Sequence, residues 1–163
     1  MKHLLLIAIA FIAFSCNSKA QDKKTLAKTN SFTVVKTDAE WKQVLDRQEY
    51  DILRKAGTEP PFSSPLNKNY EEGTYVCAAC ATPLFESEHK FDSGTGWPSF
   101  DRPIEGNVSF GTDNKIGYTR DEEHCGTCGG HLGHVFRDGP KETTGERHCI
   151  NGAALDFIPA KNE

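Results

Sequence analysis

The segments Cys77-Ala-Ala-Cys80 and Cys125-Gly-Thr-Cys128 repeat one pattern, two cysteines separated by two residues, with 44 residues between the segments. Four thiolates in two such pairs match a closed tetrahedral Zn²⁺ site, because the short loop lets both sulfurs of a pair face one ion. A site with four protein ligands has no open position for chemistry. The spacing therefore predicts one structural zinc ion per subunit, which joins two distant segments of a small domain.

Two other interpretations of these cysteines stay open. An exported chain can form two disulfides, and a CxxC pair can be a thioredoxin-like redox centre. A redox CxxC normally opens a helix within a βαβ unit, and neither pair lies in such a pattern here. The spacing therefore favours zinc over both alternatives.

The sequence around the cysteine pairs is typical of antiparallel β structure. From residue 70 onward, short apolar pieces alternate with clusters of Gly, Pro, Asn and Asp, and none keeps a helical period for long. The pieces are Thr74–Cys77, Leu84–Phe85, Val108–Phe110, Ile116–Tyr118 and Leu155–Ile158. We expect a mainly β domain with long loops.

Two short helices are predicted before the β region. Thr37-Asp-Ala-Glu40 has the capping-box spacing, and Asp46-Arg-Gln-Glu49 repeats it. Gly57 is the expected stop of the second helix, and Pro60-Pro61 forbid its continuation. We expect both helices to pack on the strands that follow.

The N-terminus has the organisation of an export signal, which we place at residues 1–20. Lys2 precedes the charge-free apolar run Leu4–Phe14, which is too short to span a bilayer. The run closes at Ser15-Cys16, as a bacterial lipoprotein signal does, with cleavage before the cysteine. Ser18-Lys-Ala20 is an alternative site for ordinary signal peptidase. We favour the lipoprotein interpretation.

Export determines where the protein is expected and what it carries there. We expect a periplasmic or cell-envelope lipoprotein. If cleavage instead precedes Gln21, we expect a periplasmic or secreted protein. The membrane contact we expect is an N-terminal lipid. Loss of residues 1–20 removes two lysines and no acidic residue, which takes the formal charge from -4 to about -6. An acidic chain without a basic run argues against nucleic acid as a partner. Residues 21–36 are expected to form a polar tether, and 37–160 one domain.

Cys149 is the mature cysteine that remains once the four proposed ligands are set aside. It lies in Arg147-His-Cys-Ile-Asn151, and neighbouring Arg and His cations favour the thiolate, which is the nucleophilic form of the side chain. The alternative is an inert buried cysteine. The charged neighbours favour a nucleophile.

Two further segments combine polar and aromatic residues. His131 and His134 lie three residues apart in the segment Cys128-Gly-Gly-His-Leu-Gly-His-Val-Phe136. Such a pair can serve as metal ligands, as acid–base groups or as plain polar loop residues. Because zinc already has four thiolates, acid chemistry is the favoured function of this pair. The loop Phe91–Phe100 holds three aromatic residues, and its Trp97 either covers the core or forms a recognition face.

Taken together, these residues resemble the B-type methionine sulfoxide reductases, which act on methionine-R-sulfoxide. The likeness extends from about Trp41 to Ile158. Its motifs are Gly57-Thr-Glu-Pro-Pro-Phe62, Tyr75-Val-Cys-x-x-Cys80, Phe91-Asp-Ser-Gly-Thr-Gly-Trp-Pro-Ser-Phe100, Cys125-x-x-Cys128, His131-Leu-Gly-His-Val-Phe136, Asp138-Gly-Pro140 and Arg147-His-Cys-Ile-Asn151.

The resemblance implies a fold and a set of site residues. The fold would have two antiparallel sheets in a barrel-like core, N-terminal helices, and zinc bound away from the active site. In the implied site, Cys149 is the nucleophile and Arg147 stabilises its thiolate. His131, His134 and Asn151 would surround the sulfoxide oxygen, with His134 as the leading proton donor. Trp97 and Phe136 would form an apolar wall for the substrate methyl group.

The resemblance also implies a reaction and its partners. Methionine-R-sulfoxide in oxidised proteins would be reduced through a Cys149 sulfenic acid, and a thioredoxin-like or other thiol reductant would regenerate the enzyme. Many members of the family carry a resolving cysteine just before Gly-Trp, where this chain has Thr95. We therefore expect an external thiol to reduce the sulfenic acid directly.

Two other classes of function stay open at this point. A zinc-ribbon binding module would use Cys149 and the histidine pair only structurally. A Cys–His hydrolase would need an oxyanion hole and an acyl-enzyme. Neither class accounts for the Trp97 loop, the histidine pair and the Cys149 segment together.

Overall fold

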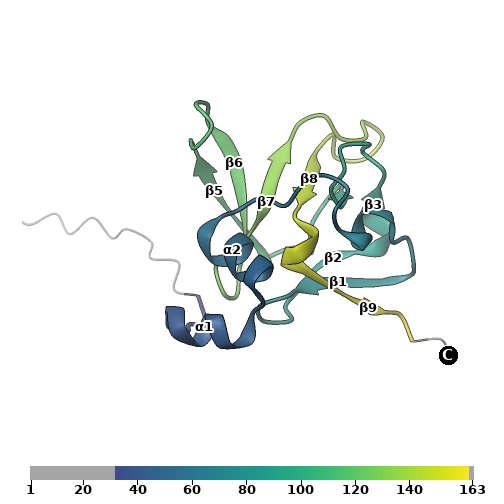
Figure 1. Ribbon diagram of the computed structural model, residues 1–163. Coiled ribbons are helices and arrows are strands. Elements are labelled where there is room, and N and C mark those ends of the chain that lie inside the picture. Colours follow the sequence, from purple (N-terminus) through teal and green to yellow (C-terminus); the bar gives the residue numbers. More distant parts are fainter. Residues whose placement is uncertain (1–31, 162–163) are drawn as a thin grey trace, which may run out of the picture. The chain divides into compact units, whose positions relative to one another are not determined.

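A computed structural model describes residues 32–161, which contain nine strands, two α-helices and three short 3-10 helices (Figure 1). The predicted signal segment, residues 1–20, lies outside the described residues, and so does most of the predicted tether. In the described range, no helix is both long and apolar enough to cross a membrane.

The strands form two antiparallel sheets. The three-stranded sheet has the order β2-β1-β9, with bounds Pro83–Glu86, Gly73–Cys77 and Leu155–Pro159. The six-stranded sheet has the order β3-β4-β8-β7-β6-β5, with bounds Lys90–Phe91, Ser99–Phe100, Arg147–Ile150, His131–Phe136, Arg120–Cys125 and Val108–Asp113. The prediction of a mainly β fold with two antiparallel sheets is confirmed.

Both predicted helices form, and each begins with a capping box. α1 (Asp38–Val44) is capped by Thr37 and Glu40, and α2 (Arg47–Lys55) by Asp46 and Glu49. α2 packs against β7 and the 3-10 helix Gly152–Ala154. The other two 3-10 helices are Pro65–Lys68 and Ser87–His89. α2 ends at Ala56, which forms its C-cap in a left-handed conformation.

The end of α2 differs by one residue from the prediction. Ala56, not Gly57, takes the left-handed conformation, with φ of 49°. The Gly57 N–H then donates to the Asp51 carbonyl at 3.0 Å, and a Cβ on Gly57 would lie 2.8 Å from that oxygen. Glycine is therefore needed here for close approach to the helix end.

The core between the helices and the two sheets is aromatic. Phe85 and Phe100 stack with ring centroids 4.4 Å apart, and Tyr75 meets Phe100 edge-on at 5.0 Å. The helices add Trp41 and Leu53, each 2% exposed. This packing joins strands of both sheets, which is how so short a β domain buries a continuous core.

One apolar piece was wrongly expected to be a strand. Ile116–Tyr118 lies in the connection between β5 and β6, and Ile116 and Tyr118 are exposed. Conversely, β6 was missed because its sequence, Arg-Asp-Glu-Glu-His-Cys, is almost entirely polar. Several of its polar side chains belong to the site described below, and they interrupt the alternation of apolar and polar residues by which a strand is recognised in a sequence.

Candidate active site

The four paired cysteines come together at the ends of β1 and β6. The Cys77 and Cys128 sulfurs lie 3.7 Å apart, and the Cys80 and Cys125 sulfurs 3.6 Å apart. All four sulfurs lie within 4.8 Å of one another, and all four residues are free thiols. Four cysteines from two distant knuckles could thus hold one metal ion.

The sulfur distances fit zinc. With Zn–S bonds of about 2.3 Å, the sulfurs of a tetrahedral site lie about 3.8 Å apart. A disulfide needs about 2.05 Å, which is far shorter than either sulfur–sulfur contact. The second knuckle also receives the chain that precedes α1, because the Val34 N–H donates to the Thr127 carbonyl at 3.0 Å.

A second set of polar residues lies on one face of the six-stranded sheet, in two rows across the strands. In the first row Cys149 of β8 pairs with His134 of β7, His134 pairs with Glu122 of β6, and Glu122 pairs with Gly111 of β5. In the second row His131 pairs with His124 of β6.

A β-bulge explains how the two histidines of β7 share a face. Glu123 pairs with Gly133, but the next residue, His124, pairs with His131, so Leu132 is extra. Three residues apart, His131 and His134 would point to opposite faces of a regular strand. The bulge re-aims one of them, and their ring centroids lie 5.4 Å apart.

Cys149 faces a pocket of about 110 Å³ that the predicted substrate residues also line. The wall is formed by Thr58, Trp97, Arg120, Gly133, His134, Phe136, Cys149 and Asn151. Five of these eight residues were predicted as site residues from the sequence. The four paired cysteines are not among them, so the metal-binding cluster does not line this pocket.

Thr95 lies beside the Cys149 sulfur. Its hydroxyl oxygen is 4.0 Å from that sulfur and also contacts the Ser93 hydroxyl at 2.8 Å. The loop reaches this position through Gly94 and Gly96, both with positive φ. The position at which many relatives of the resembled family carry a second cysteine is therefore in contact with Cys149.

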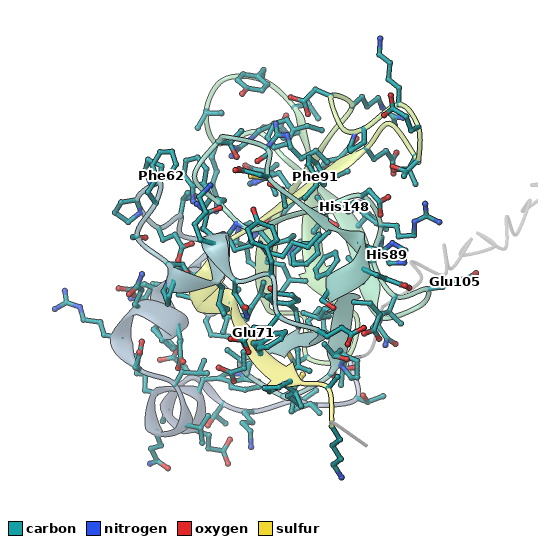
Figure 2. All side chains as sticks on the ribbon, turned by 90° about the vertical axis from the view of Figure 1, so that its right-hand side faces the viewer. Phe62, Glu71, His89, Phe91, Glu105 and His148 are labelled. Atoms are coloured by element: carbon teal, nitrogen blue, oxygen red, sulfur yellow. The ribbon has the colours of Figure 1, made fainter. Side chains whose placement is uncertain are left out.

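The charge around Cys149 differs in part from the expectation. Burial raises the pKa of the Cys149 thiol above its ordinary value, and the Arg147 cation and the Thr95 hydroxyl oppose that rise. His148 does not contribute a nearby cation, because it points to the other face of β8. It is 1% exposed and lies 2.6 Å from the Glu123 carboxylate in the core (Figure 2).

Arg147 is held behind the pocket rather than in its wall. Its guanidinium makes two hydrogen bonds of 2.9 Å to Asp138 and lies over the Phe136 ring, 4.4 Å from the centroid. Only 7% of Arg147 is exposed. Arg147 thus places a fixed positive charge on the Cys149 face of β8 and supports the Phe136 ring.

His134 is positioned by Asp113, a residue that sequence reasoning missed. His134 Nε2 and the Asp113 carboxylate lie 2.9 Å apart, and Arg120 donates to the same carboxylate oxygen at 2.5 Å. The Lys115 backbone N–H, His134 and Arg120 hold the pKa of Asp113 well below its ordinary value. Burial lowers the pKa of His134, which Asp113 opposes.

His131 is more deeply enclosed and does not line the pocket. Its Nδ1 lies 2.6 Å from the Glu122 carboxylate, and burial lowers its pKa to about 4. Its Nε2 is buried and has no hydrogen-bond partner among the described residues. His131 is therefore held as a neutral imidazole beside His134 and is not among the residues that line the pocket.

Asn151 and Trp97 are both fixed by Glu59, another residue that sequence reasoning missed. The Glu59 N–H donates to the Asn151 side-chain oxygen at 3.0 Å, and Trp97 Nε1 donates to the Glu59 carbonyl at 3.2 Å. The Glu59 carboxylate accepts from the Gly152 and Ala153 N–H groups at 2.5 and 2.9 Å. The one sequence signal that included Glu59 was the motif Gly57-Thr-Glu-Pro-Pro-Phe62.

Comparison with known proteins gives one family. The model of the SelR domain matches residues 45–159. A peptide methionine sulfoxide reductase MsrB from Chromohalobacter salexigens is 48% identical over 129 residues, which are 78% of this chain and 97% of that protein. A protein of the same name from Leptospira interrogans is 51% identical, with the same coverage.

A further relative and a solved structure are also similar to this chain. An MsrB from Herminiimonas arsenicoxydans is 51% identical over 80% of this chain and 96% of that protein. Among solved structures, the Mis18 "Yippee-like" domain is similar over 56% of this chain and all of that chain, with 15% identity and a TM-score of 0.43.

Proposed function

Because this chain belongs to the SelR family and to the B-type peptide methionine sulfoxide reductases, we propose that it acts on the R epimer of methionine sulfoxide in proteins, with Cys149 as nucleophile. Methionine sulfoxide reduction itself follows from the family. The binding-module and hydrolase alternatives are therefore set aside.

One observation carries the proposed chemistry: a single small pocket holds a thiol, an imidazole and two aromatic rings. Trp97 and Phe136 supply an apolar wall suited to the methyl group of the substrate. Cys149 and His134 lie opposite each other on neighbouring strands, so a sulfoxide sulfur can face the thiol while its oxygen faces the imidazole. The fixed wall is what would distinguish the two epimers.

The protonation states favour delivery of the thiol's own proton to the sulfoxide oxygen. Burial raises the pKa of Cys149 and lowers the pKa of His134, so the resting pair is a neutral thiol and a neutral imidazole. The Cys149 sulfur attacks the substrate sulfur as His134 transfers the thiol proton to the oxygen. The substrate sulfur gains two electrons, Cys149 loses two, and the net products are methionine and Cys149 sulfenic acid.

We further propose that an external thiol reduces the sulfenic acid directly. The Thr95 hydroxyl oxygen lies 4.0 Å from the Cys149 sulfur, and a threonine cannot form a disulfide. A first thiol would form a mixed disulfide with Cys149 and release water, and a second thiol would release the free Cys149 and a disulfide product. A thioredoxin-like protein or another thiol would serve as reductant.

Zinc and export complete the proposal. The sulfur distances support one structural Zn²⁺ held by Cys77, Cys80, Cys125 and Cys128, which would join the ends of β1 and β6. The apolar run after Lys2 supports export to the cell envelope, with an N-terminal lipid on Cys16 favoured over release before Gln21. The mass of the mature N-terminus would distinguish these two routes.

The test of the reaction is turnover of the separated R and S epimers of a methionine-sulfoxide peptide, with dithiothreitol as reductant. We expect the R epimer to be reduced and the S epimer to stay unchanged. A Cys149→Ser variant should lose all turnover, because the hydroxyl of serine is a poor nucleophile toward sulfur. Reduction of the S epimer, or turnover by Cys149→Ser, would contradict the proposal.

A further inference from the structure

Where the two rows of the sheet face adjoin, three side chains of metal-ligand type come together, and the proposed reaction does not require them as a group. Glu122 and His124 lie on β6, and His131 lies beside them on β7. One ligand atom from each residue lies within 4.8 Å of the other two. The bulge that re-aims the β7 histidines also creates this cluster.

Two imidazoles converge on one carboxylate oxygen. His131 Nδ1 lies 2.6 Å from Glu122 Oε1, and His124 Nε2 lies 3.3 Å from the same atom. Metal–ligand bonds of about 2.1 Å place neighbouring ligand atoms about 3.0–3.4 Å apart. The His124–Glu122 distance fits that range, and the His131–Glu122 hydrogen bond would lengthen slightly as a metal replaces its proton.

The cluster has an entrance and room to adjust. The His124 and Glu122 side chains are 27% and 13% exposed, whereas His131 is 3% exposed, so a hydrated ion would approach from the His124 side. Gly111 of β5 lies next to the ring, and a Cβ there would come within 3.5 Å of His124 Cε1. The glycine therefore leaves space in which the His124 ring can turn.

We propose that Glu122, His124 and His131 form a second metal site, separate from the four-cysteine cluster, for a divalent transition-metal ion. Two imidazoles and one carboxylate suit Zn²⁺, Co²⁺ or Ni²⁺ rather than Mg²⁺ or Ca²⁺, which prefer oxygen ligands alone. Three protein ligands leave coordination positions for water. A bound metal would hold the His131 ring, whose centroid lies 5.4 Å from the centroid of the His134 ring.

The test uses Co²⁺ as the probe, added to the untagged mature chain that already holds one zinc ion. Equilibrium dialysis without thiols should show one additional Co²⁺ per chain. The visible spectrum should lack an intense thiolate-to-cobalt charge-transfer band, because the ligands are nitrogen and oxygen. Such a band would show that Co²⁺ had instead entered the cysteine cluster, and would overturn the proposal.

Matched variants locate the site. His124→Ala and, separately, Glu122→Gln should each weaken Co²⁺ binding by on the order of tenfold or more. The control is His89→Ala, because His89 also lies beside two carboxylates, Glu88 and Asp101, at 3.5 and 3.2 Å, at the edge of the fold (Figure 2). Equal binding by wild type and both cluster variants, each with unchanged thermal unfolding, would overturn the proposal. So would equal loss in the control.

A second measurement asks whether the site regulates the enzyme, and this part rests on the proposed function. Single-turnover formation of methionine, without added thiol, avoids chelation of the probe. Co²⁺ should slow this turnover in wild type and leave the His124→Ala variant unaffected. Binding without inhibition would keep the metal site and overturn its regulatory effect, whereas inactivity without Co²⁺ would count against the proposed function alone.

Discussion

The two places where this domain uses cysteine are built in opposite ways. At the knuckles, four sulfurs from two distant segments face one another, and three of the four residues are at most 2% exposed. In the pocket, Cys149 faces an imidazole, a hydroxyl and two aromatic rings, with a fixed cation behind it. The first arrangement could hold one metal ion through all four sulfurs, and in the proposed mechanism the second leaves one sulfur to react.

The difference shows what sets the role of a cysteine. Spacing alone assembles the knuckles, because each loop brings its own two sulfurs together. The surroundings of Cys149 depend instead on the fold around β8. His134 lies beside Cys149 through strand pairing and Thr95 through a loop, whereas Arg147 lies two residues away on the same strand. Variants of one site should therefore change stability, and variants of the other should change rate.

The largest expected effect is on stability at the knuckles. A structural zinc site contributes on the order of 10 kcal/mol of binding free energy, which is comparable to the whole stability of a domain, about 5–15 kcal/mol. Cys125→Ser should therefore lose zinc and most of its cooperative unfolding transition. Metal analysis and calorimetry measure both quantities.

Cys149→Ser is the matched control for that experiment. It also replaces one thiol by a hydroxyl, but it should keep its zinc and its unfolding temperature while turnover disappears. If Cys125→Ser were as stable as wild type with its metal gone, the contrast between a structural and a reactive cysteine site would fail.

The next effect concerns the proton transfer by His134. His134→Gln should lower kcat by about 10²-fold or more, the usual contribution of an acid–base group. Asp113→Asn keeps the shape of the residue that orients His134, so we expect it to lower kcat by less than His134→Gln does.

The pH profile tests the same assignment independently of the rate. Because His134 must be neutral to accept the thiol proton, activity should fall as the pH drops through its lowered pKa. Asp113 raises that pKa, so Asp113→Asn should move the acid limb of the profile to still lower pH. A limb that moved to higher pH would contradict the assignment.

The sequence predicted the cysteine cluster better than it predicted the surroundings of Cys149. Capping boxes, the CxxC pairs and the apolar pieces of β1 and β9 are local signals, and each formed as expected. Asp113 and Glu59 escaped notice because the site residues that they position, His134 and Asn151, lie 21 and 92 residues away. The position of His131 depends on a bulge that no local pattern announces.

A smaller change would make the reactive site resemble the paired knuckles. Thr95→Cys places a second thiol where the hydroxyl now lies 4.0 Å from the Cys149 sulfur, on a loop flanked by Gly94 and Gly96. After one turnover without reductant, we expect an intramolecular disulfide in this variant. Wild type should instead gain the mass of one oxygen atom. Mass spectrometry distinguishes the two products, and Thr112→Cys on β5, which is exposed, should behave as wild type.

The smallest effect concerns the cation behind Cys149. Arg147→Gln removes the positive charge that opposes the burial-raised pKa of the thiol, so that pKa should rise further. Alkylation of Cys149 by iodoacetamide at neutral pH should become several-fold slower, and its pH midpoint should move upward. Arg147→Lys keeps a charge at the position and should retain part of the wild-type rate, which a purely structural role in supporting Phe136 would not explain. Asp138→Asn tests the opposite direction: without its carboxylate partner the Arg147 charge acts on Cys149 with less compensation, so the midpoint should stay or move downward. An equal upward shift in Arg147→Lys and Asp138→Asn would show that geometry, and not charge, connects this pair to the nucleophile.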